Sequence, residues 1–372
     1  MVRDLRRFDF FLLLACLALV GYGLALIYSG SLARYGSGHA AFTHVVVKQA
    51  LFAAFGLLLM LLVTQLDYRA WNTLAPALYA VSVLALMAVL VIGHKEFGSR
   101  RWFPTPVLQL QPSELAKLVT IVFLAKYLSD DRRRVRTAQG FLITLALAAV
   151  PAGLVFLEPD LGTAVVFIAV WLGMIYVAGA RMKHLLTFLG ACVASIPFVV
   201  LIGLSGYQKD RFQSFIDPAK DPLGAGFNIL QSEISIGSGG WWGKGFTHGP
   251  QTQLAYLRTQ TTDYVFSVLG EELGFVGAMV LFFLFIVLLF RGLRTASRSP
   301  DDFGRYIATG IVIMIVVQTF INIGVNVRLF PVTGIPLPFI SQGGSSLLTM
   351  FVAVGILQSI AVRRRATPFR SS

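Results

Sequence analysis

The sequence predicts an all-α integral membrane protein, a bundle of about ten transmembrane helices with a large extracytoplasmic loop between the seventh and eighth helices. Hydrophobic residues make up 56% of the 372 residues and charged residues only 13%. The mean hydropathy of +0.74 also lies far outside the range of a soluble domain. One long polar stretch, from Gly203 to Asp263, separates two groups of apolar runs.

Each predicted span is an apolar run of roughly the ~20 residues that cross ~30 Å of hydrocarbon. The ten runs are residues 10–29, 44–64, 72–92, 113–128, 139–157, 161–179, 184–203, 264–290, 305–327 and 340–362. The fourth is short and carries charge, so it is the weakest. The first lacks a small-residue cleavage site, which predicts an uncleaved anchor rather than a signal peptide. We interpret residues 1–372 as a single transmembrane domain whose outer loop is residues 204–263.

The distribution of Lys and Arg predicts the orientation. With the N-terminus inside, the inner segments hold 18 of these residues and the outer segments hold 10. An excess of positive charge marks cytoplasmic segments, so both termini are predicted to be cytoplasmic and the long loop to face outward from the cytoplasmic membrane. The net charge of +13 reflects this bias and an attraction to anionic lipid.

Composition also argues against several kinds of site. Cys16 and Cys192 both lie inside predicted spans, so no disulfide framework or thiolate zinc site is expected. The five histidines are scattered without metal-ligand spacing. No basic and aromatic nucleic-acid module is present, which argues against a nucleic-acid partner.

The first candidate site is an outer segment with Arg100, Arg101 and Trp102. Two arginines break the charge bias of the outer face, and an arginine pair is suited to bidentate capture of phosphate oxygens. Contact with lipid headgroups is the alternative explanation.

The second candidate site opens the fourth span. A proline at the first helical position places Glu114 and Lys117 three residues apart on one face, just below the outer surface. Ionisable groups at this depth usually face a bundle interior or a wet cavity. An ion pair that only fixes helix packing is the alternative.

The third candidate is the tight connection between the fifth and sixth spans, which holds Glu158 and Asp160. Asp160 is placed to cap the sixth span, whereas the role of Glu158 stays open.

The fourth candidate is Asp263, at the end of the long loop. Asp263, Ser267, Gly270, Gly274 and Gly277 fall on one narrow face of the eighth helix. The small residues favour close helix packing. Asp263 lies at the aqueous end of this face, where a general base could meet a hydroxyl group.

Several motifs together resemble the SEDS family of bacterial cell-wall proteins, over nearly the whole chain and in the same order. These motifs are Gln111–Glu114, Glu158–Thr163, Gln231–Gly240, Gly243–Gly245, Thr262–Gly277 and Pro331–Ser346. Gly243–Gly245, Thr252–Leu254 and the double arginine before Trp102 are more similar to the rod-shape-determining members than to the division members. Two departures are Arg258–Thr261, where the family usually has Pro-Glu-x-His, and Gln342, where it usually has Tyr.

The resemblance implies a peptidoglycan glycosyltransferase of cell elongation and shape maintenance. Such an enzyme polymerises lipid II, an undecaprenyl-diphosphate-linked disaccharide peptide, on the outer face of the membrane, with a class B penicillin-binding protein as its partner. Asp263 is then the catalytic residue. The expected substrate-binding residues are Arg100, Arg101, Trp102, Glu114, Lys117, Glu158, Asp160, Lys244, Ser341 and Ser345.

The implied reaction is an inverting transfer with Asp263 as base and Arg100 with Arg101 at the departing diphosphate. The resemblance identifies no definite cofactor; a divalent cation could share the diphosphate role, and Glu158 or Asp160 could hold it. The alternatives are a flippase or transporter of the lipid-linked precursor, a scaffold for a transpeptidase, and a division polymerase of the same family.

Overall fold

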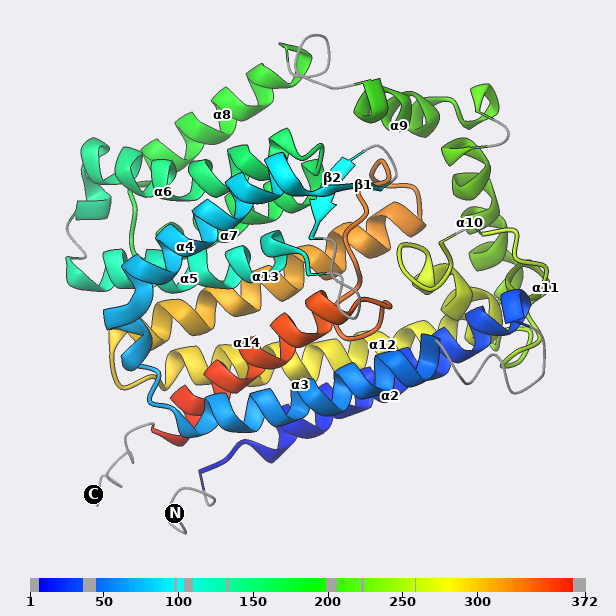
Figure 1. Ribbon diagram of the computed structural model, residues 1–372, viewed down its shortest axis with the longest axis horizontal. Helices are drawn as coiled ribbons and strands as arrows, with labels where there is room; N and C mark the ends of the chain where they lie inside the picture. Colours follow the sequence, from blue (N-terminus) through cyan, green and yellow to red (C-terminus); the bar gives the residue numbers. More distant parts are fainter. Residues whose placement is uncertain are drawn as a thin grey trace.

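The structure is a computed structural model that describes residues 7–35, 45–96, 99–103, 110–131, 134–198, 206–221, 224–257 and 259–363. These residues form a bundle of α-helices (Figure 1). A single small antiparallel hairpin accompanies the described helices, with β1 (His94–Glu96) paired to β2 (Ser99–Trp102).

Ten helices coincide with the ten predicted spans. They are α2 (Phe10–Tyr35), α3 (Val47–Gln65), α4 (Ala70–Ile92), α5 (Pro112–Asp130), α6 (Ala138–Leu157), α7 (Leu161–Val177), α8 (Met182–Phe198), α12 (Val265–Ser297), α13 (Asp302–Asn326) and α14 (Gly344–Val362). Seven helices of the described chain are long and apolar enough to cross a membrane, whereas α7 and α8 are apolar but shorter, and α5 contains charged side chains. The all-helical membrane fold is confirmed, and the number of spans stays a prediction.

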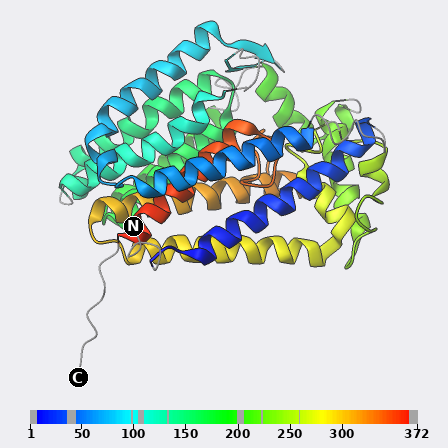
Figure 2. The ribbon, with the colours of Figure 1, turned by 60° about the horizontal axis from the view of Figure 1, so that its bottom comes forward.

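The helices α13 and α14 form the centre of the bundle. In their most apolar 18-residue stretches, 61% and 83% of the residues are buried. The helix α14 packs on α3, and α13 packs on α5, α7 and α12. Figure 2 shows α2 lying along α12, as their contacts require. By contrast, only 17% of the most apolar 18-residue stretch of α4 is buried. Its exposed apolar side chains, such as Val81 and Leu84, form a surface suited to lipid rather than to water.

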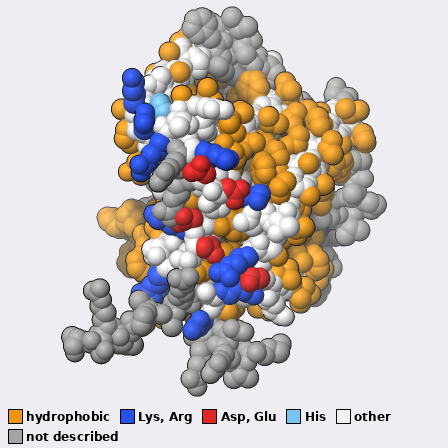
Figure 3. All heavy atoms as spheres, turned by 90° about the vertical axis from the view of Figure 1, so that its left-hand side faces the viewer, with side chains coloured by type: hydrophobic (Ala, Val, Ile, Leu, Met, Phe, Trp, Pro, Cys, Tyr) orange, Lys and Arg blue, Asp and Glu red, His pale blue; other side chains and the backbone are white. Residues whose placement is uncertain are grey.

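The first and last helices meet at one end of the bundle. The backbone N–H of Asp9 donates to Gln358 Oε1 at 3.0 Å, and Gln358 Nε2 donates back to the Asp9 carbonyl at 2.7 Å. Figure 3 faces this end, where charged side chains gather beside a surface of apolar ones. The ion pairs Arg291–Asp9 and Arg69–Asp301 lie here. The side of the membrane on which this end lies stays a prediction.

The long polar stretch is itself folded and lies at the opposite end of the bundle (Figure 1). It contains α9 (Gly206–Ile216), η4 (Pro218–Lys220), α10 (Ala225–Gly239) and α11 (Pro250–Gln253), and a further short turn, η2 (Arg134–Arg136), precedes α6. The helix α10 packs against α12 so closely that a Cβ on Gly239 would lie 1.9 Å from the Gly270 carbonyl oxygen.

The small-residue face predicted on α12 is a packing surface only in part. Gly270 meets α10, and Gly277 lies under Tyr22 of α2, in agreement with the packing role. Gly274, however, leaves the helical conformation with φ 62° and ψ −158°. The helix is broken there, so the prediction of one regular face through Gly277 is wrong.

Candidate functional site

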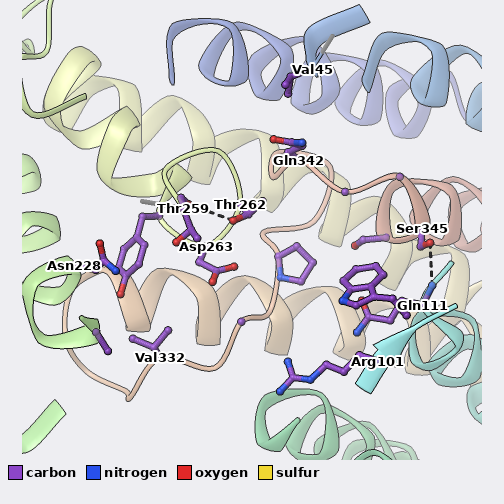
Figure 4. A pocket seen from close by; sticks show the side chains of 18 of the residues that line it. Val45, Arg101, Gln111, Asn228, Thr259, Thr262, Asp263, Val332, Gln342 and Ser345 are labelled. Atoms are coloured by element: carbon purple, nitrogen blue, oxygen red, sulfur yellow. Dashed lines mark hydrogen bonds between the residues drawn. The ribbon is translucent and has the colours of Figure 1, made fainter. Parts of the chain in front are cut away.

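A cavity of about 800 Å³ opens where the long polar stretch meets the bundle. Its walls come from α3, β2, α9, α10, the segment before α12 and the segment between α13 and α14 (Figure 4). The polar side chains that line it are Lys48, Gln49, Arg101, Trp102, Gln111, Asp210, Arg211, Asp221, Asn228, Thr259, Thr262, Asp263, Tyr264, Gln342, Ser345 and Ser346. A cavity lined by sixteen polar side chains is suited to bind a large polar ligand.

Asp263 lies on the wall of this cavity, two residues before α12 begins, and its carboxylate points inward (Figure 4). Its backbone is held from several directions. The Asp263 N–H donates to the Thr259 carbonyl at 3.1 Å. Its own carbonyl accepts from Asn326 Nδ2 at 2.8 Å and from Asn322 Nδ2 at 3.2 Å, both on α13. The carboxylate is therefore presented by a rigid backbone.

The electrostatic environment of Asp263 contains opposing influences. Burial raises the pKa of the Asp263 carboxyl above its usual value, while the nearby charges of Arg211 and Arg101 lower it. Desolvation disfavours the ionised form and cations favour it. A carboxylate with a raised pKa that still faces a cavity is suited to accept a proton.

Arg101 joins β2 to the turn between α6 and α7. Its Nε donates to the Glu158 carbonyl at 3.1 Å, and its Nη2 donates to the Pro159 carbonyl. Its Nη1 lies 3.6 Å from Asp160 Oδ2. The side chain is 8% exposed and lines the cavity. Arg101 is therefore a fixed cation, and not a mobile surface arginine at the headgroups.

The two carboxylates of this turn have different environments. Asp160 caps α7, since its Oδ1 accepts from the Thr163 N–H at 3.1 Å, which confirms the predicted cap. Glu158 is buried, and neither of its carboxylate oxygens has a hydrogen-bond partner among the described residues. Burial and the nearby Asp160 raise the pKa of Glu158 to about 8, against the opposing effect of Arg101. Glu158 is thus protonated at neutral pH.

Two other residues of the first candidate site are Trp102 and Arg100. Trp102 lines the cavity beside Arg101. Arg100 pairs with Lys95 through the backbone of the hairpin, but its side chain lies outside the described residues. Its predicted contact with substrate stays a prediction.

Glu114 and Lys117 form the predicted ion pair, with Lys117 Nζ 2.8 Å from Glu114 Oε1. Both side chains are buried in α5, and neither lines the cavity. Glu114 Oε2 has no hydrogen-bond partner among the described residues. The structure thus shows a pair inside the bundle, and contact with substrate stays a prediction.

The remaining predicted residues fall into two groups. Ser345 lines the cavity and accepts the Gln111 N–H at 3.2 Å. Ser341 is buried and donates to the Thr262 carbonyl at 2.6 Å, so it supports the residue beside Asp263. Lys244 does not line the cavity, and its Nζ lies 3.8 Å from Glu271 Oε1.

Several residues of the site were not predicted from the sequence, and four of them make hydrogen bonds that hold it together. Arg211, on α9, lines the cavity, and its Nη1 donates to the Val332 carbonyl at 3.0 Å. Gln49 of α3 accepts the Gly343 N–H at 3.2 Å. Asn322 and Asn326 hold Asp263. The asparagines did carry a signal, since two polar residues four positions apart in an apolar helix share one face.

The residues proposed for a divalent cation do not form a metal site. No three His, Cys, Asp or Glu side chains gather in a metal-binding arrangement within the described part of the chain. Asp160 bonds a helix N-terminus and faces Arg101, and its neighbour Glu158 has a raised pKa. Asp160 is thus already engaged by protein groups, so this turn is not a preformed cation site.

Comparison with known proteins shows the family to which the chain belongs. Residues 10–366 match the model of the FtsW, RodA and SpoVE family, described as "Cell cycle protein". The chain is 40% identical over 358 residues to stage V sporulation protein E of Bacillus subtilis, covering 95% of this chain and 96% of that protein. It is 36% identical over 354 residues to the peptidoglycan glycosyltransferase MrdB of Escherichia coli, covering 95% and 93%.

Solved structures agree with this assignment. A chain from a study of how a peptidoglycan synthase complex coordinates polymerization and crosslinking superposes with a TM-score of 0.81 at 33% identity, covering 96% of this chain and 98% of that one. The rod shape determining protein RodA of Thermus thermophilus superposes with a TM-score of 0.71 at 30% identity, covering 97% and 98%. The chain belongs to the FtsW, RodA and SpoVE family, which is the SEDS family.

Proposed function

We propose that this protein is a peptidoglycan glycosyltransferase that polymerises lipid II into glycan strands. The observation that carries the proposal is Asp263, a carboxylate with a raised pKa that points into a large polar cavity also lined by Arg101 and Arg211. The names of its relatives support the same activity, since MrdB of Escherichia coli is a peptidoglycan glycosyltransferase at 36% identity.

The reaction requires a base at the acceptor hydroxyl. The 4-hydroxyl oxygen of one lipid-linked disaccharide attacks the anomeric carbon of a second, while the bond from that carbon to the diphosphate oxygen breaks. The hydroxyl proton passes to the Asp263 carboxylate. The network around Asp263 holds the backbone that carries this carboxylate, and a positioned base contributes about 10²–10⁴-fold.

The leaving diphosphate requires positive charge rather than a general acid. Arg101 provides a cation whose position is fixed by two backbone carbonyls. A fixed donor stabilises developing charge without reorganisation during the reaction. Inversion at the anomeric carbon follows, because the attacking oxygen and the departing diphosphate occupy opposite faces.

The biological setting belongs to the same proposal. The cavity lies at the end of the bundle opposite the one where Asp9 and Gln358 meet, and the charge bias of the sequence supports a position for it on the outer face of the cytoplasmic membrane. The rod-shape-like motifs Gly243–Gly245 and Thr252–Leu254 favour a role in cell elongation, and the similarity to a chain of a peptidoglycan synthase complex supports a class B penicillin-binding protein as the partner. A division role would instead require the division partner.

A precursor transporter is the second candidate. The buried Glu114–Lys117 pair within α5 favours it, since intramembrane ionisable pairs often mark a transport pathway. A transporter would move lipid II between leaflets of a vesicle and make no glycan.

The test is polymerisation of lipid II by the purified protein, alone and with its class B partner. The Asp263→Asn variant should insert and bind lipid II but lose polymerisation by ~10² or more. Asp217→Asn is the matched control, because Asp217 lies on the same polar stretch and does not line the cavity. Wild-type rates in Asp263→Asn would refute the base assignment, and absence of glycan from the wild type with its partner would refute the function.

A further inference from the structure

We infer that Arg211 and Arg101 form a diphosphate-binding cradle around Gly334, at the leaving-group side of the cavity. This inference deepens the proposed function and rests on it. It assigns a role to Arg211, on α9, and to Gly334, in the segment between α13 and α14.

The geometry centres on Gly334. A Cβ built on this residue would lie 3.7 Å from Nη1 of Arg101 and 3.7 Å from Nη1 of Arg211. All three residues line the cavity. Two guanidinium groups therefore approach the same small volume from two sides, one from β2 and one from α9. Like charges brought together in this way are suited to an anion that carries more than one charge.

Both guanidinium groups are held in position. Arg101 is anchored by the carbonyls of Glu158 and Pro159. Arg211 Nη1 donates to the Val332 carbonyl, two residues before Gly334. Because the guanidinium group has five N–H donors in a rigid fork, one anchored edge still orients other donors. The cradle is thus largely formed before a ligand arrives.

Glycine at position 334 keeps this space open. Its φ of +74° is a conformation that side chains other than glycine rarely adopt. Any side chain would also project between the two guanidinium groups, where we place the phosphate oxygens.

The position next to Asp263 fits the chemistry of transfer. Both arginines lie close enough to Asp263 to act on its charge. In the reaction, one anomeric carbon lies between the acceptor oxygen, which the base serves, and the diphosphate oxygen, which departs. A diphosphate site must therefore lie near the base without coinciding with it, and Gly334 and Asp263 line the same cavity. Figure 4 shows Asp263 and Arg101 directed into one cavity from different elements.

A simpler explanation is that the arginines only neutralise Asp263 and Asp160. Arg101 lies 3.6 Å from Asp160, so it has one carboxylate partner. The two explanations differ in what the arginines bind: a counter-ion role predicts no affinity for a soluble or lipid-linked diphosphate.

The experiment measures binding without catalysis. Purified full-length protein in nanodiscs of neutral lipid is titrated with undecaprenyl diphosphate, undecaprenyl monophosphate and inorganic pyrophosphate, and binding is followed by native mass spectrometry. The variants are Arg211→Gln, Arg211→Lys and Arg101→Gln. The control is Lys209→Gln, which removes one charge from an exposed position of α9 outside the cavity. A second series adds an anionic phospholipid to test whether bulk headgroups compete.

The wild type should bind undecaprenyl diphosphate more tightly than the monophosphate. Arg211→Gln should weaken diphosphate binding about 10-fold or more, as expected for loss of a charge-assisted contact, and Arg211→Lys should restore part of it. Lys209→Gln should bind as the wild type does. Unchanged diphosphate affinity in folded Arg211→Gln would overturn the cradle, as would an equal loss for monophosphate and diphosphate or full displacement by the anionic phospholipid.

Failure of the cradle and failure of the proposed function remain distinguishable. A wild type that polymerises lipid II while Arg211→Gln keeps full diphosphate affinity loses the cradle and retains the function. A wild type that binds diphosphate through Arg211 and makes no glycan with its partner retains the cradle and loses the function. Thermal unfolding of each variant identifies any loss of affinity that arises from misfolding.

Discussion

Asn326 Nδ2 donates a hydrogen bond to the backbone carbonyl of Asp263 at 2.8 Å. Oδ1 of the same asparagine accepts from the backbone N–H of Ser267 at 3.1 Å and from the Ser267 hydroxyl at 2.6 Å. One fully buried side chain on α13 thus fixes both the residue that carries the carboxylate and the first turn of α12.

Removing Asn326 should therefore impair catalysis through position and not through charge. In Asn326→Ala, the Asp263 carbonyl keeps Asn322 as a donor and the Ser267 N–H keeps the Tyr264 carbonyl as an acceptor, so the cost is that of the lost hydrogen bonds, about 0.5–1.5 kcal/mol each. We expect the polymerisation rate to fall at least about 10-fold, since small displacements of a catalytic group cost up to about 10²-fold, while lipid II binding changes little. Rates and affinity measured on the same preparation test this.

Thr319→Val is the control for helix α13. Thr319 is buried on the same helix, and its hydroxyl has no hydrogen-bond partner among the described residues. The control should retain wild-type stability and rate. If Asn326→Ala loses lipid II binding as much as rate, then Asn326 supports the cavity as a whole and not the base alone.

The buried Glu114–Lys117 pair should show strong energetic coupling. Leaving one charge unpaired in a buried site costs about 3–5 kcal/mol, whereas removing both charges avoids this cost. Thermal unfolding of Glu114→Gln, Lys117→Met and the double variant in detergent gives the coupling energy. The double variant should be more stable than the sum of the single changes implies. Simple additivity would mean that the ion pair does not stabilise the fold.

Glu158 should make the stability of the protein depend on pH. Its pKa is raised from 4.5 to about 8, so the folded state holds a proton that the unfolded chain releases. The folded state then binds more protons than the unfolded state between these two values, and stability falls as pH rises from about 4.5 to about 8. Above about 8 the stability no longer changes with pH through Glu158, because the carboxyl is ionised in both states.

Glu158→Gln removes this titration while keeping the shape of the side chain. The melting temperature of the wild type should fall relative to that of the variant as pH is raised from 5 to 8. A constant difference across this interval would show that Glu158 does not hold its proton in the folded protein.

Elements whose signal is local were predictable. Apolar runs near 20 residues long located the ten helices, because the lipid interior permits little else. The Glu114–Lys117 pair followed from three-residue spacing on a helix, and the Asp160 cap followed from its place before α7. For the ion pair and the cap, the two partner residues lie three positions apart, within one helical turn.

The parts that depend on tertiary structure were not predictable. Arg211 reaches the cavity only because α9 lies beside the segment that follows α13, where Arg211 binds the Val332 carbonyl, and no pattern in the polar stretch distinguishes it from Lys209. The break at Gly274 depends on the turn at Gly243, which packs against α12. A Cβ added to Gly274 would lie 2.3 Å from the backbone nitrogen of Gly243. The same turn places Lys244 Nζ 3.8 Å from Glu271 Oε1, a contact that its motif did not indicate, and its contact with substrate stays a prediction.

The pH dependence of polymerisation should report the environment of Asp263. A base works only when deprotonated, so the rate falls as pH falls through the pKa of Asp263. Burial raises this pKa above the usual value of 3.8, and the positive charge of Arg211 is the first of the influences that oppose the rise. In Arg211→Gln that opposition is lost, so the pKa should rise further and the acidic limb of the rate profile should move to higher pH. Lys209→Gln should leave the limb where it is in the wild type. A limb that stays in place or moves to lower pH in Arg211→Gln would show that Arg211 does not act on the charge of Asp263, or that the titrating base is another residue.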